Sequence, residues 1–276
     1  MLGRLGMTVD QSIRAYKKFA QTAFTTRRPK FFQKPWPTTF SDINLENAIK
    51  QVIHDSCTKA PCVELRQLDS SVYTTCAHED LLFYDRSCTE TAVLALTSVN
   101  VEIVPTLLRA YDRSDEFTGC KIWEVAGATS AAASFFSPIQ IGRCSVKFID
   151  ANFDYNNSCE ILIREAKKKS SPGQPMIITS IGTGLGNVVG IRDTTSSVIE
   201  ALKAMASTSK QATLRLKNEY RNIGGYYRFD VDDGLRDTTV SDWGGMSRIS
   251  AHTKNYLCKN EHAIREFVQA FTVALL

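Results

Sequence analysis

Asp150 is the residue whose type and position point most directly to chemistry. It ends the apolar stretch Val146–Asp150, which predicts a buried strand, and open α/β sheets place ligand-contacting groups at the carboxyl ends of such strands. A carboxylate there can act as a general base, while the polar residues that follow, Asn156 and Asn157 among them, can hold the loop through local hydrogen bonds. From spacing alone, an aspartate that closes a turn is the simpler interpretation.

A glycine-rich turn, Gly182-Thr-Gly-Leu-Gly186, follows another apolar stretch. Such a turn can offer backbone N–H groups to a phosphate. Its spacing matches neither the dinucleotide fingerprint nor the P-loop, and no Lys-Ser/Thr pair follows it. We therefore interpret it as a turn in which two backbones approach closely.

The eight cysteines include no Cys-x-x-Cys pair. A zinc site built from Cys57, Cys62, Cys76 and His78 would not have the usual ligand spacing. The sequence thus predicts reduced, mostly buried thiols and neither a metal nor another cofactor.

These residues need a scaffold, and the hydrophobic pattern predicts an α/β fold. Short apolar runs alternate with amphipathic segments, which favours a mostly parallel sheet flanked by helices. The expected strands are Thr91–Thr97, Val99–Val104, Val146–Asp150, Pro175–Ile181 and Tyr226–Val231. The expected helices begin at Thr8 and Ser41, span Lys121–Phe136, Cys159–Lys169 and much of Thr194–Tyr220, and form a pair within Val240–Leu276.

The helix that begins at Thr8 has two clear sequence signals. Thr8 and Gln11 are spaced as a capping box, and Val9, Ile13, Tyr16 and Ala20 recur at helical intervals. The pattern predicts one buried apolar stripe along this helix.

Composition narrows the class of partner. Lys and Arg number 33 and Asp and Glu 29, so the net charge is only +4, which is too small for a dedicated nucleic-acid binder. Apolar stretches such as Thr91–Val104 are interrupted by polar residues, so no transmembrane span is expected. The first residues lack the apolar core of a secretory signal, which predicts a cytoplasmic location, with peripheral attachment to membranes left open.

Four ordered blocks resemble the patatin-like phospholipases, which are lipid acyl hydrolases with a Ser-Asp dyad. Met1–Asp10 is similar to the segment after that family's nucleophile helix, and Lys121–Phe136 to its Ala-Thr-Ser-Ala-Ala-Pro block. Lys147–Asn157 resembles the segment with the catalytic Asp and the Asn-Asn that follows it, and Ser180–Gly184 the strand and turn that close the domain. Tyr226–Leu257 looks like the helical extension of fungal-type members.

The resemblance implies a partial three-layer patatin-like domain over residues 1–187 and a mainly helical extension over 188–276. It implies that Asp150 is the dyad base and that a lipid or membrane surface supplies the acyl ester substrate. No Gly-x-Ser-x-Gly elbow occurs in the 276 residues, and by the resemblance the serine would lie roughly two helical turns before Met1. The chain alone is therefore predicted to be inactive.

Two other hypotheses stay open. Met1 can be a wrongly chosen start, in which case the gene encodes a full hydrolase. The chain can also be a non-catalytic lipid-binding or scaffold remnant. An in-frame elbow upstream of Met1 would support the wrongly chosen start. Vesicle binding without turnover would support the non-catalytic remnant. The sequence does not fix an oligomeric state.

Overall fold

The computed structural model divides the chain into two compact units, Met1–Ala151 and Asn152–Leu276. The strand Ile178–Ile181 belongs to the second unit, whereas the sequence interpretation placed these residues in a first domain that ran to residue 187. That boundary lies outside the described residues. The structure describes residues 1–25, 40–57, 78–98, 105–112, 116–132, 135–151, 157–171, 174, 176–182, 209–220, 225–231, 234–235, 238 and 243–274.

The first unit contains a four-stranded sheet in the order β2-β1-β4-β3. Asp150 ends β4, which lies between β1 and β3, so its backbone belongs to an internal strand. The strands are β1 (Ala92–Thr97), β2 (Thr106–Arg109), β3 (Ile139–Ile141) and β4 (Val146–Asp150).

The expectation of a mostly parallel sheet is wrong for this unit, because all three strand pairs are antiparallel. For β3 and β4 the reason is the short connection between them. A four-residue turn, Gly142–Ser145, joins β3 to β4, with positive φ at Gly142 and at Ser145. A connection that short permits only antiparallel pairing, since a parallel crossover needs a dozen residues or more.

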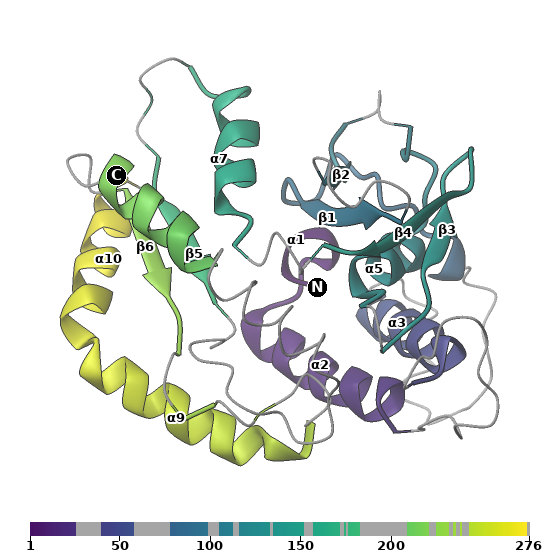
Figure 1. Ribbon diagram of the computed structural model, residues 1–276, viewed down its shortest axis with the longest axis horizontal. Helices are drawn as coiled ribbons and strands as arrows, with labels where there is room; N and C mark the ends of the chain where they lie inside the picture. The colour runs from purple at the N-terminus through teal and green to yellow at the C-terminus, as the bar shows by residue number, and fades with distance from the viewer. Residues whose placement is uncertain are drawn as a thin grey trace. The chain divides into compact units, whose positions relative to one another are not determined.

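Three helices stack beside this sheet (Figure 1). α5 (Ile122–Ser130) packs on β1, β3 and β4, α3 (Asp42–Ser56) packs on α5, and α2 (Val9–Ala23) packs on α3. Both predicted starts are confirmed, since Thr8 and Gln11 form the capping box of α2 and the Ser41 hydroxyl accepts a hydrogen bond from the Asn44 N–H. α5 is shorter than the expected Lys121–Phe136, because the backbone leaves the helical region at Ala131.

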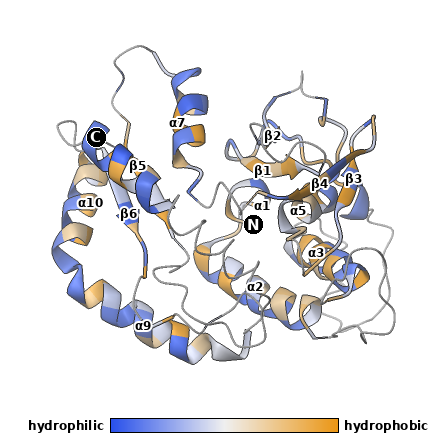
Figure 2. Ribbon diagram, viewed as in Figure 1, coloured by the Kyte–Doolittle hydropathy of each residue, from blue (hydrophilic) through white to orange (hydrophobic). Residues whose placement is uncertain are grey.

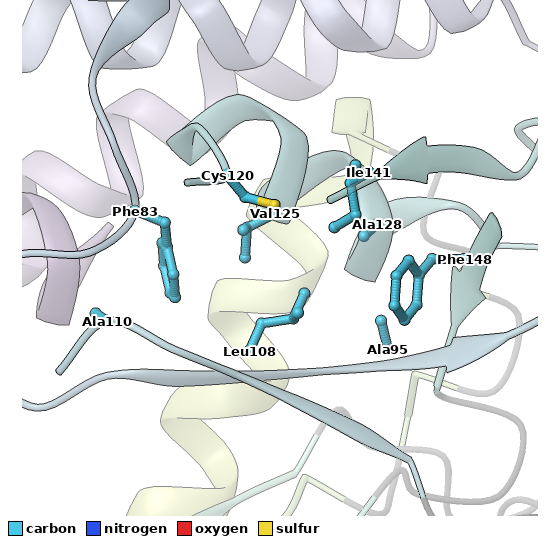
Figure 3. Packing of buried hydrophobic residues seen from close by; sticks show 9 residues of the cluster. All are labelled: Phe83, Ala95, Leu108, Ala110, Cys120, Val125, Ala128, Ile141 and Phe148. Carbon is cyan, nitrogen blue, oxygen red and sulfur yellow. The ribbon is translucent and has the colours of Figure 1, made fainter. Parts of the chain in front are cut away.

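The core between the sheet and α5 fixes the strand that carries Asp150. Phe148 is completely buried, and its ring lies near Ala95, Ala128 and Ile141 (Figure 3). Because side chains alternate along a strand, Asp150 lies on the same face of β4 as Phe148, the face that α5 covers. A second core joins α2, α3 and α5 through Ala23, Phe40, Ile49, Ile53, Ile122 and Phe136, among others.

The apolar stripe of α2 is buried at one end only, which corrects the prediction of a single buried stripe. Ala20 and Ala23 are buried. Val9, Ile13 and Tyr16 lie on the same line and are exposed. The reason is that the residues that pack on this face, from α3 and around Phe40, reach only its carboxyl-terminal turns.

The second unit is built around two parallel strands, β5 (Ile178–Ile181) and β6 (Tyr226–Phe229). Ile178 packs with residues of α7 (Cys159–Lys167) and of the helical segment 209–219. Phe267 of α10 (Glu261–Ala274) contacts the rings of Tyr227 and Phe229. The predicted pair of terminal helices is confirmed as α9 (Met246–Lys259) and α10. Short elements elsewhere are α1 (Leu2–Leu5), η1 (His78–Asp80) and η2 (Trp243–Gly245).

Candidate functional site

Asp150 is held firmly by its backbone. Its Cα pairs with that of Ala95 on β1, and its N–H donates a hydrogen bond of 3.0 Å to the carbonyl of Ala131, the residue after α5. Only 6% of the residue is exposed, and Ala151 beyond it is buried as well. The predicted strand end is confirmed, and it places a carboxylate at the meeting point of β1, β4 and the end of α5.

The polar tract after Asp150 is described only at Asn157. Its side-chain carbonyl accepts a hydrogen bond of 3.3 Å from the Cys159 N–H, at the start of α7, and its amide donates to the Thr213 hydroxyl at 3.1 Å. Asn157 thus makes the local type of hydrogen bond that was expected of the tract. Asn152, Asp154 and Asn156 lie outside the described residues.

The amino terminus of the first unit is anchored beside β1. The Arg4 guanidinium donates hydrogen bonds to the carbonyls of Leu82 (2.7 Å) and Phe83 (2.8 Å), and it lies 3.2 Å from an Asp85 carboxylate oxygen. Gly3 lies so close to the Thr91 side chain that there is no room for a β-carbon. Met1–Leu5 are thereby fixed near the start of β1.

This anchoring sets the distance from the chain start to Asp150. Thr91 precedes β1 directly, and Ala95 is the residue of β1 that pairs with Asp150. Four residues of a strand span about 13 Å, so the first residues lie about that far along β1 from the level of Asp150.

Electrostatics support the anchor. The pKa of Asp85 is held below its usual value, mainly because the Ser87 hydroxyl and N–H donate hydrogen bonds to its carboxylate, with a further contribution from the Arg4 charge. Asp85 thus stays ionised opposite Arg4 at neutral pH.

A second polar cluster lies at the carboxyl ends of β5 and β6, and the sequence analysis missed it. The Arg228 guanidinium donates to the Ser180 hydroxyl at 2.6 Å and to the Ser209 hydroxyl at 3.4 Å, and it lies 3.1 Å from an Asp230 carboxylate oxygen. The Arg228 side chain is only 5% exposed. The one signal in the sequence is an arginine within the aromatic strand Tyr226–Phe229.

This cluster explains the first glycine of the glycine-rich turn. A β-carbon at Gly182 would collide with the side chains of Asp230 and Arg228, and the Gly182 N–H donates to the Phe229 carbonyl at 2.7 Å. At Gly182 the structure therefore agrees with the interpretation of a close backbone approach. Gly184 and Gly186 lie outside the described residues.

We expect Arg228→Ala to lower the free energy of unfolding of the second unit by about 2–4 kcal/mol, because it removes the buried donor to two buried hydroxyls and the ion pair with Asp230. Hydrogen exchange of β5 and β6 peptides, measured by mass spectrometry across a urea series, reports this loss. Arg215→Ala is the matched control, because the Arg215–Glu160 ion pair is exposed to solvent and contributes little to stability. Equal effects of the two substitutions would contradict the structural role given to Arg228.

The described residues contain neither a candidate metal cluster nor a helix that could span a membrane. Within the described ranges, no three His, Cys, Asp or Glu side chains are placed to hold a metal ion. Cys62 and Cys76 of the alternative zinc set lie outside those ranges. A search of the same part of the chain finds no helix with the length and apolar character that crossing a bilayer requires.

Comparison with known proteins adds no relative. No model of a known protein family matches the chain, and no curated protein matches it.

Proposed function

We propose that this chain carries the base half of a Ser-Asp lipid acyl hydrolase of the patatin-like type, with Asp150 as the base. The observation that carries the proposal is the burial of the Asp150 carboxylate at the end of an internal strand. Burial of a carboxylate costs free energy, so a buried carboxylate whose backbone is fixed on both sides is a candidate for catalysis. One of the four sequence blocks that resemble the family, Lys147–Asn157, contains the same residue.

The proposed chemistry needs a serine beside Asp150. The carboxylate takes the proton of the hydroxyl as the serine oxygen attacks the ester carbonyl, and backbone N–H groups stabilise the oxyanion. Asp150 then gives that proton to the departing alkoxide, which leaves as the alcohol while the acyl-enzyme forms. Water next attacks the acyl-enzyme and gives a proton to Asp150, which passes it to the serine oxygen as the fatty acid is released.

The 276 residues provide the base but no Gly-x-Ser-x-Gly elbow. The proposed substrates are acyl esters of phospholipids or neutral glycerolipids at a membrane surface.

We expect the purified 276-residue chain to hydrolyse no chromogenic acyl ester and to bind no fluorophosphonate covalently, because a carboxylate without an activated hydroxyl forms no acyl-enzyme. The assay follows p-nitrophenol release together with the mass of the intact protein after fluorophosphonate treatment. Turnover that is lost on Asp150→Ala, together with a labelled serine, would show that the nucleophile is among these residues after all.

A further inference from the structure

The exposed end of the α2 stripe is the largest apolar feature of this helix that the fold leaves open. Val9, Ile13 and Tyr16 are 63%, 46% and 44% exposed, and they follow one another at intervals of four and three residues. Such residues share one face of a helix. Figure 2 shows apolar segments alternating with hydrophilic ones along α2.

Basic residues accompany this stripe. Arg14 and Lys17 are exposed, and neither forms an ion pair with another described residue. Lys18 pairs with Asp55 at 2.7 Å and is not part of this set. Asp10 is the acidic residue of the first turn, so the free charges near the stripe sum to a positive value.

From these features we infer that the amino-terminal half of α2 docks on an anionic lipid surface. An apolar stripe with basic residues beside it is the pattern of helices that lie in the membrane interface. Tyr16 suits that position, because tyrosine side chains, which have an apolar ring and a polar tip, are enriched at membrane–water interfaces. Arg14 and Lys17 supply the charge that anionic headgroups attract.

A second copy of the chain fits this surface less well. Stable protein interfaces bury about 800 Å² on each partner and involve some 20–30 residues on each side. Three side chains on two turns of one helix fall far short of that, whereas they suffice for shallow insertion between lipid headgroups.

The biological purpose of this docking rests on the proposed function, because a lipid acyl hydrolase must reach a membrane. Its test measures vesicle binding and involves no hydrolysis. A negative result would therefore leave the proposed role of Asp150 untouched, and a positive result would not establish that role.

The experiment is co-sedimentation of the full 276-residue chain with vesicles of phosphatidylcholine alone and of phosphatidylcholine with 30% phosphatidylserine. We expect binding to the anionic vesicles only. Val9→Ser, Ile13→Ser and Tyr16→Ser combined should weaken it roughly 100-fold. Arg14→Gln with Lys17→Gln should weaken it roughly 25-fold.

Matched controls lie on the second unit. Leu162→Ser with Leu214→Ser removes exposed apolar side chains, and Lys210→Gln with Lys217→Gln removes exposed charges, both without touching α2. Circular dichroism checks that each variant keeps its helix content. Absence of binding, equal binding to both vesicles, or equal losses in controls and α2 variants would overturn the inference. The inference would also be overturned if analytical ultracentrifugation showed a dimer of the chain and the combined Val9→Ser, Ile13→Ser and Tyr16→Ser substitution abolished that dimer.

Discussion

Asp150→Asn should reduce acyl ester hydrolysis about 10⁴-fold in a form of the chain that has been given a nucleophile. In this form, here called the elbow fusion, the first strand, oxyanion loop and Gly-x-Ser-x-Gly elbow of a patatin-like hydrolase are joined to Met1. The large effect follows because the asparagine amide has nearly the size of the carboxylate but cannot accept the serine proton. The rate of p-nitrophenyl ester hydrolysis at saturating substrate measures it.

Two controls accompany this prediction. Asp10→Asn makes the same chemical change on the exposed first turn of α2 and should leave the rate of the fusion unchanged. Substitution of the elbow serine by alanine should abolish turnover. If the Asp150→Asn and Asp10→Asn forms of the elbow fusion hydrolyse the ester at the same rate, Asp150 is not the base.

Phe148→Ala should lower the free energy of unfolding of the first unit by about 3–5 kcal/mol. Phe148 has no exposed surface, and truncation of its ring leaves a cavity between β4 and α5 that neighbours such as Ala95 and Ala128 are too small to fill. Because Phe148 lies two residues before Asp150 on the same strand face, the loss should also impair the elbow fusion. Urea denaturation followed by circular dichroism gives the stability, and the esterase assay gives the activity.

Phe271→Ala is the comparison for this substitution. Phe271 lies on α10 and about half of it is exposed, so its removal should change the free energy of unfolding by less than about 1 kcal/mol. A Phe148→Ala protein as stable as Phe271→Ala would mean that the packing between β4 and α5 is not what holds Asp150 in place.

Local signals in the sequence predicted the local structure well. The Thr8–Gln11 capping box starts α2, and Ser41 starts α3. The apolar run Val146–Asp150 forms β4, whose first and last residues are those predicted. Each depends on interactions between residues within a few positions of one another, so one segment of sequence contains the whole cause.

The direction of the sheet could not be predicted in the same way. β2 and β3 have four and three residues, too few to show a clear alternation, and both were missed. Without them, the helices between the longer strands suggested parallel crossovers. Recognition of Gly142–Ser145 as a hairpin turn would have indicated antiparallel pairing.

For the candidate site, sequence predicted the position of Asp150 but not its environment. Its burial depends on Ala95 and Ala131, which are distant in sequence, and on the packing of α5. The exposure of Val9, Ile13 and Tyr16 was missed for a related reason, since the same periodicity marks a stripe whether or not another element covers it. Arg228 was missed because its partners Ser180 and Ser209 come from other segments.

The most direct measurement is a crystal structure of the elbow fusion after reaction with a fluorophosphonate. Our account predicts phosphorus bonded to the elbow serine and an Asp150 carboxylate oxygen within about 3 Å of that serine's Oγ. A different carboxylate or a histidine at that distance, with Asp150 turned away, would contradict the assignment of Asp150 as the base.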